Sequence, residues 1–169
     1  MGMVAIFIAV DEDSVLTKAS ALGLRKGRTS VKVTDTLGDA LDRAIDQAAE
    51  VDIDKAWDLL HRCLNGGKLE PLRDTAEAMA IYGQADVTGM DGAVFYLSRA
   101  EVPNIAATLA KFDDGKIARI IPALADQEVY GWSGDLEEDS AYALQGLQIL
   151  RDFYSDCASK GKAAVITIE

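Results

Sequence analysis

The stretch DIDKAWDLLH, residues Asp52–His61, decides more about the fold than any other part of this sequence. Asn65 and the glycine pair at residues 66–67 follow it, and glycine is the residue that most often ends a helix. Asp54 is able to stand at the start, where its carboxylate meets the free N–H groups and the positive end of the helix dipole. The pattern therefore predicts a helix over residues 54–64.

Three side chains of this helix, Asp54, Asp58 and His61, are spaced at i, i+4 and i+7 and share one face. Such a trio is able to bind a divalent ion. His61 is the only histidine, however, whereas a catalytic zinc usually takes three ligands rich in histidine. Because both helix ends also favour these charges for stability, we prefer structural roles and predict no metal and no cofactor. His61 is the one candidate catalytic residue, as a general base.

Aromatic side chains provide the other candidates for a binding site. Trp57 and His61 are i, i+4 neighbours that can stack into one patch, although core packing is the ordinary role of a tryptophan. Trp132 lies between glycines, in a loop that either binds a ligand or covers the core, and Tyr130 is its neighbour. The predicted ligand-binding residues are Asp54, Lys55, Trp57, Asp58, His61 and Trp132.

Strand-like segments occur at both ends of the chain and near its middle. The apolar runs VAIFIAV (residues 4–10), AVFYL (93–97) and AAVITI (163–168) are typical of buried strands, and residues 30–33 suit a shorter one. Helical patterns separate them, but the order of strands and helices is not regular. The sequence therefore predicts an α+β fold, a small mixed sheet packed with about five to six helices, with α/β as the alternative.

Local signals set the expected ends of the other helices. Asp11 is able to cap a helix after the first strand, and residues 72–79 suit a short helix before a loop at 83–92. Residues 98–101 form a capping box, unless the helix begins nearer Pro103. Pro122 should kink or divide a later helix. Asp139 or Ser140 is expected to cap a long helix that ends at residue 161.

Composition limits the class of protein. The chain has 169 residues, a length that suits one domain, and its two cysteines, Cys63 and Cys157, form no CxxC pair. They favour reduced thiols in a cytoplasmic protein, with a single bridge between them as the alternative. The apolar start is far shorter than the roughly 20 residues that span a bilayer. We therefore expect no membrane partner.

Negative charge is the strongest surface feature. The formal net charge of −11 disfavours nucleic acid, because phosphate binding needs a basic surface. In a helix expected after Thr36, the residues Asp39, Asp42 and Asp46 form a row at i, i+3 and i+7. Residues 126–139 hold six acids and no base. These charges are either plain solvated surface or a face that attracts a basic protein partner.

Catalytic signatures are missing. The sequence contains no GxxxxGK[ST], GxGxxG, GxSxG or HExxH motif. Two hypotheses follow. The first is a non-catalytic interaction or binding protein with an acidic partner surface. The alternative is a small-molecule-binding protein or hydrolase that uses the helix face of Trp57 and His61. The oligomeric state is open.

The segment Asp52–His61 also resembles a known family, the YfbM-like family of bacterial domain-of-unknown-function proteins. That family has an Asp-aliphatic-Asp-Lys-small-Trp core before a helix that carries a histidine. Four further segments are similar to it: residues 1–3, 96–98, 101–102 and 160–162. Residues 80–84 and 90–93 depart from its pattern. The resemblance implies one compact α+β domain over residues 1–169 in a bacterial cytoplasm, and it implies no activity.

Overall fold

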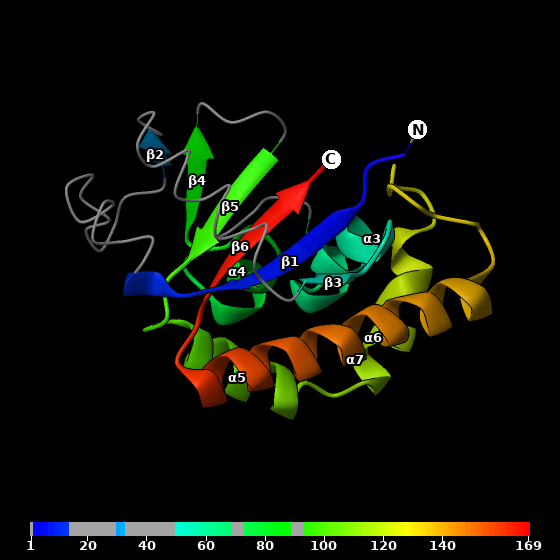
Figure 1. Ribbon diagram of the computed structural model, residues 1–169. Helices are drawn as coiled ribbons and strands as arrows, with labels where there is room; N and C mark the ends of the chain where they lie inside the picture. The colour runs from blue at the N-terminus through cyan, green and yellow to red at the C-terminus, as the bar shows by residue number, and fades with distance from the viewer. Residues whose placement is uncertain (1, 14–29, 33–49, 69–72, 89–92) are drawn as a thin grey trace.

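The chain folds around a six-stranded sheet with the strand order β2-β4-β5-β6-β1-β3 (Figure 1). The computed structural model describes residues 2–13, 30–32, 50–68, 73–88 and 93–169. Its strands are β1 (Ala5–Val10), β2 (Ser30–Lys32), β3 (Glu50–Asp52), β4 (Ala85–Thr88), β5 (Ala93–Leu97) and β6 (Ala163–Ile168). Its helices are α3 (Ala56–Leu64), α4 (Ala76–Tyr82), α5 (Val102–Lys111), α6 (Gly115–Ile120), the 3₁₀ helix η2 (Ile121–Leu124) and α7 (Leu136–Lys160).

The two ends of the chain pair with each other in the middle of this sheet. β1 and β6 run antiparallel, with Phe7 opposite Ile166, and β1 also pairs with β3 while β6 pairs with β5. Among the described strands only β2 and β4 run parallel, so the sheet is mixed. Apolar runs with few polar side chains suit central strands, because both faces of the sheet are covered there. The predicted α+β class with a small mixed sheet is confirmed.

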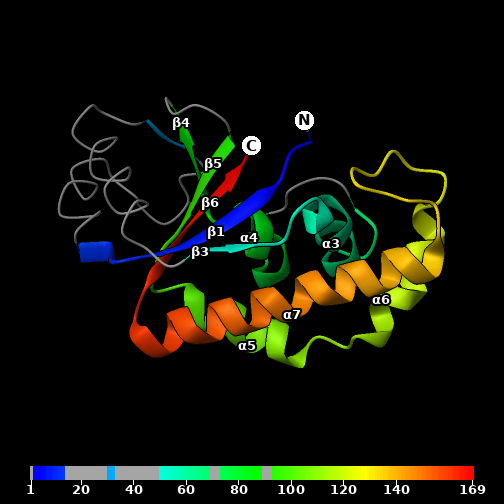
Figure 2. The ribbon, with the colours of Figure 1, turned by 45° about the vertical axis from the view of Figure 1, so that its right-hand side comes forward.

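Helices α3, α4, α5 and α7 lie on the same side of the sheet, with α7 running across the layer (Figures 1 and 2). The ring of Phe7 reaches into this layer and meets Phe153 and Tyr154 of α7 edge-on, at centroid distances of 5.9 and 6.3 Å. The hydroxyl of the fully buried Tyr154 donates to the carbonyl of Ala80 at 2.8 Å. The core therefore joins the central strands to α4 and α7. None of the described helices is both long and apolar enough to cross a membrane.

Two short strands were not expected. Residues 83–92 were predicted to be a loop, yet residues 85–88 form β4, and β3 precedes α3. β4 exists because β5 supplies its backbone partners, with Asp86 opposite Phe95. The turn into it depends on Gly83, which has φ 55° and ψ −170°, a region that is nearly exclusive to glycine.

The starts of α4 and α5 correct two expectations. α4 begins at Ala76 rather than at residue 72, because the side chain of Thr75 accepts the N–H of Ala78 at 3.2 Å. The capping box at residues 98–101 does not form, and α5 begins at Val102 with Pro103 in its first turn. Proline is tolerated there because that turn needs no N–H from it. The alternative start near Pro103 was therefore the right one.

The long helix α7 begins earlier than predicted. Its cap is Asp135, whose carboxylate accepts the N–H groups of Glu137 and Glu138 at 3.0 Å each. Asp139 and Ser140, the expected caps, lie inside the helix. The end at residue 161 is confirmed, and so is the division at Pro122, which separates α6 from η2.

Some expectations fall outside the described residues. The row Asp39, Asp42 and Asp46 and the body of the helix after Asp11 are among them. Asp11 itself accepts the N–H of Asp13 at 3.2 Å, as a capping residue does. The interpretation of the cysteines as free thiols is confirmed, because Cys63 and Cys157 are both buried and unbridged.

Gly83→Ala is expected to destabilise the protein by at least about 2 kcal/mol, because the backbone conformation excludes other residues and a Cβ cannot move aside. That Cβ would stand 2.6 Å from the backbone oxygen of Tyr96. Gly66→Ala is the matched control, since Gly66 also has positive φ but has open space around it. It should cost only about 1 kcal/mol. Urea unfolding followed by circular dichroism measures both, and equal losses would contradict the close approach at Gly83.

Stability is expected to fall as the pH rises above about 9. Burial raises the pKa of the Cys63 and Cys157 thiols to about 12. The unfolded chain therefore releases these protons at a lower pH than the folded chain does. The loss should reach at most about 1.4 kcal/mol per pH unit for each thiol. Urea unfolding at pH 8 and pH 10 measures it. A Cys63→Ala/Cys157→Ala variant should show a smaller loss, and an unchanged one would contradict this origin.

Candidate functional site

Helix α3 contains most of the predicted site residues, and every residue from Ala56 to Leu64 is buried. It packs against α4, α6 and α7. Its remaining side contacts the segment Gln127–Gly134, which we call the strap. The strap lies between η2 and α7 and runs past the start of α3. The site therefore consists of a buried helix, the strap over it and the turn that leads into α3.

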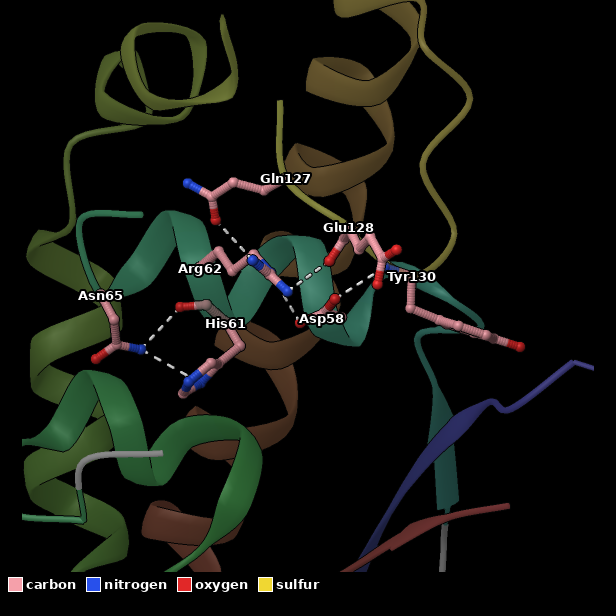
Figure 3. A network of polar contacts seen from close by, with 7 residues as sticks. All are labelled: Asp58, His61, Arg62, Asn65, Gln127, Glu128 and Tyr130. Carbon is pink, nitrogen blue, oxygen red and sulfur yellow. Dashed lines mark hydrogen bonds and ion pairs between the residues drawn. The ribbon is translucent and has the colours of Figure 1, made fainter. Parts of the chain in front are cut away.

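A buried ion pair links α3 to the strap (Figure 3). The Nε of Arg62 lies 3.1 Å from Oδ1 of Asp58, and these side chains are only 4% and 6% exposed. Arg62 also donates through Nη1 to the side-chain oxygen of Gln127 at 2.7 Å and through Nη2 to the carbonyl of Glu128 at 2.8 Å. Oδ2 of Asp58 accepts the N–H of Tyr130 at 2.8 Å. Both charges thus complete their hydrogen bonds with strap groups.

His61 faces α4 and is fully buried. Its Nδ1 lies 3.3 Å from the amide nitrogen of Asn65, which also donates to the backbone oxygen of His61 at 2.8 Å (Figure 3). When that amide donates to Nδ1, the imidazole is neutral and its proton is on Nε2. The ring meets Tyr82 edge-on at a centroid distance of 4.6 Å. This geometry fits a structural role for His61, but as a packed core residue and not as the favourable charge at the helix end that the sequence indicated.

Trp57 occupies the junction of α3, the strap and the N-terminal segment. Its ring stacks on Tyr130 at a centroid distance of 5.5 Å and meets Tyr82 edge-on at 6.4 Å. Its indole N–H donates to the carbonyl of Met3 at 3.3 Å. Only 8% of Trp57 is exposed. Core packing, the ordinary role of a tryptophan, therefore describes it, and Tyr82 is the ring that both Trp57 and His61 contact.

Asp54 corrects the prediction that it would cap α3. The cap residue is Lys55, and no side chain bonds there. Asp54 instead adopts the left-handed backbone region at φ 51°, which is uncommon for a residue other than glycine. Its N–H donates to Asp52, and its Oδ2 accepts the hydroxyl of Tyr142 at 2.8 Å. That hydroxyl oxygen also accepts the N–H of Lys55 at 3.0 Å. The hydroxyl of Tyr142, which is far away in the sequence, therefore bonds to both Asp54 and Lys55 in this turn.

Three segments meet tightly at Lys55. A Cβ on Gly2 would stand 2.6 Å from Cε of Lys55, and one on Gly131 would stand 2.8 Å from its backbone oxygen. The hydroxyl of Tyr130 accepts the N–H of Met3. Sequence reasoning missed Gly2, Gly131 and Tyr142 as parts of this site. The glycine beside Tyr130 was a visible signal, but nothing in the sequence linked it to Lys55.

A second buried carboxylate holds the far end of the strap. Asp139 is 2% exposed and accepts the N–H groups of Ser133 and Gly134 at 3.0 and 3.2 Å. An acid of the predicted capping region therefore binds a loop backbone instead of its own helix. Sequence reasoning gave Asp139 a role at this helix start, but the partner groups were not visible from spacing alone.

The predicted ligand-binding residues divide into two groups. Lys55 and Trp57 meet the strap near Tyr130, Asp54 beside them bonds to Tyr142 of α7, and the half-buried Trp132 belongs to the strap itself. Asp58 and His61 lie buried, each with its own polar partner. Within the described part of the chain, no three histidine, cysteine or acidic side chains are placed to hold a metal ion, so Asp54, Asp58 and His61 do not gather as a ligand trio.

Comparison with known proteins extends these observations. A family model described as a domain of unknown function, DUF1877, matches residues 1–167. The chain belongs to the DUF1877 family. Among solved structures, it is similar to that of YfbM from Escherichia coli, a protein of unknown function, with a TM-score of 0.73 and 19% identity over 98% of this chain and 99% of that one. No curated protein matches the sequence.

The comparisons confirm the resemblance to YfbM-like proteins that the Asp52–His61 segment carries. At 19% identity, the likeness to YfbM shows that the two proteins share a fold, and it says nothing about activity. The family description names no activity either. Function therefore has to be argued from the chemistry of this chain's own surface.

Trp57→Ala is expected to destabilise the protein by about 3–5 kcal/mol, because it removes a large buried ring and leaves a cavity. Trp132→Ala is the matched control, and because Trp132 is only half buried it should cost clearly less. Urea unfolding followed by far-ultraviolet circular dichroism measures both free energies. A Trp57→Ala loss no larger than that of the control would contradict the core role of Trp57.

Proposed function

We propose that this chain is a non-catalytic protein of the bacterial cytoplasm that binds a basic protein partner through an acidic surface. The supporting observation is the fate of the six acids in residues 126–139. Asp139 is buried, and the other five are exposed on the strap region and the first turn of α7, where residues 126–139 contain no base. We call these five the acidic surface: Asp126, Glu128, Asp135, Glu137 and Glu138.

The backbone beneath the acidic surface is already fixed. Arg62 holds the carbonyl of Glu128, and Asp139 holds the N–H groups just before Asp135. Asp135 in turn caps α7. A partner would therefore meet charges on an ordered backbone, which lowers the entropy lost on binding.

Helix stability accounts for only part of this surface. Glu137 and Glu138 lie in the first turn of α7, where negative charge is favourable for the helix itself. Asp126 and Glu128 precede the cap and gain nothing from that dipole. Together with the net charge of −11, they support electrostatic attraction of a basic partner, which raises the association rate.

An apolar side chain lies among these charges. Leu136, the first residue of α7, is 44% exposed, and with Met3 it makes up the exposed large hydrophobic side chains of the described chain. Because Leu136 stands between Asp135 and Glu137 in the chain, a partner that binds these acids with basic side chains is able to contact an apolar side chain as well. The row Asp39, Asp42 and Asp46, which lies outside the described residues, stays part of the proposal on its spacing alone.

The test is affinity purification from the native cell, followed by calorimetry with the purified partner. The wild type should recover a basic protein in equal amount at low salt and lose it at high salt. An Asp126→Asn/Glu128→Gln/Glu137→Gln variant should bind at least about tenfold more weakly.

A control with the same charge change uses the exposed acids Glu50, Asp74 and Asp152, neutralised as Glu50→Gln/Asp74→Asn/Asp152→Asn. It should bind nearly as the wild type does. If both triple variants weaken partner binding equally, the effect comes from net charge and not from the acidic surface. Recovery of no partner at low salt would rule out the proposal.

The alternative, a small-molecule-binding protein or hydrolase on the Trp57/His61 face, has less support. His61 is 0% and Trp57 8% exposed, and the strap covers the side of α3 next to Tyr130. A general base must come within hydrogen-bonding distance of the proton that it removes. Asp54 and Lys55 are the exposed members of the candidate set and would be the first residues to contact such a ligand.

A further inference from the structure

We propose that the strap, Gln127–Gly134, opens as a local unit while the sheet and α7 stay folded, and that the buried Asp58–Arg62 ion pair is its latch. This inference concerns the conformation of the strap and does not depend on the partner proposal.

The strap has its own hydrogen-bonding pattern. Its backbone–backbone bonds run from Gln127 to Leu124 at 2.9 Å and from Trp132 to Val129 at 3.4 Å, so both are local. The other bonded N–H groups, on Tyr130, Ser133 and Gly134, donate to carboxylates of α3 and α7. Within the described residues, no backbone bond joins the strap to a strand, to α3 or to α7. Opening therefore breaks no bond of the sheet or of those helices.

The closed strap covers a buried ion pair. A buried ion pair loses much of its hydration. Replacing such a pair with well-packed apolar residues often leaves the free energy of unfolding unchanged or increases it. Here Nη1 and Nη2 of Arg62 are satisfied by strap groups, and so is Oδ2 of Asp58. When the strap lifts, water reaches both charges and offsets the lost bonds. The pair thus favours one closed position of the strap without making the opened state prohibitive.

The cap of α7 does not need the strap. The carboxylate of Asp135 makes both cap bonds, whereas Ser133 and Gly134 are held to the start of α7 by side-chain bonds with Asp135 and Asp139. Apolar contact opposes opening, because Val129, Tyr130 and Trp132 are half-buried against the core. The open state is therefore a minor one, lower in free energy than the unfolded chain.

Native-state hydrogen exchange read by NMR tests the proposal on the full chain. The amides of Tyr130 and Ser133 should exchange at least about tenfold faster than those of Phe7 and Ile166, after correction for intrinsic rates. Low concentrations of urea should hardly change the strap rates but should accelerate the strand amides. Strap amides with the same protection and the same urea dependence as Phe7 and Ile166 would overturn the proposal.

A variant identifies the latch. Asp58→Asn keeps an acceptor for the N–H of Tyr130 but removes the charge that pairs with Arg62. It should lower the protection of the strap amides by about tenfold or more, and their exchange should stay nearly independent of urea. Asp113→Asn, in the exposed pair with Arg119, is the control and should change neither. If Asp58→Asn lowers the protection of the Phe7 and Ile166 amides but leaves that of the strap amides unchanged, the pair stays intact when the strap opens and is not its latch.

Discussion

The pairing of β1 with β6 is the constraint on which the rest of the structure depends. Six residues from each end of the chain pair in register, from Ala5 opposite Ile168 to Val10 opposite Ala163. The sheet's centre therefore cannot form until both ends of the chain are present. β3 and β5 then add to the outer sides of this pair, and α7 reaches its place beneath the sheet directly before β6. Such distant pairing is slow to form, because loop entropy is lost before contacts are gained.

Burial of α3 beneath this sheet explains the polar chemistry of the family segment. A helix with no exposed residue has to satisfy its polar side chains within the protein. Two i, i+4 pairs do so, Asp58 with Arg62 and His61 with Asn65, and the strap completes the first of them. The polar side chains of α3 are thus explained mainly by the packing of a buried helix. This interpretation agrees with a fold that this chain and YfbM share at 19% identity, and it requires no catalytic role for the segment.

Sequence reasoning succeeded where a signal is local and continuous. The three long apolar runs became β1, β5 and β6, because each carries its own burial signal. β3 and β4 were missed, because three or four residues that include Asp52 or Asp86 become strands only through their neighbours. The same limit explains the site. Asp54 resembles a helix cap in sequence, yet the hydroxyl of Tyr142 bonds to it instead. Asp135 caps α7, whereas the buried Asp139 inside that helix binds the N–H groups of the strap, and their spacing alone does not distinguish the two roles.

The acids around the strap fall into two groups, one buried and one exposed, and only the buried group holds the strap in place. Asp58 and Asp139 point inward, where their carboxylates hold strap N–H groups in place of water. Asp126, Glu128 and Glu137 point to solvent from the backbone region that those carboxylates fix. Neutralising an inward acid changes hydrogen bonds that hold the strap, whereas neutralising Asp126 or Glu128 changes mainly the electrostatic field at the surface. A single count of negative charge would hide this distinction, so the net charge alone describes neither role.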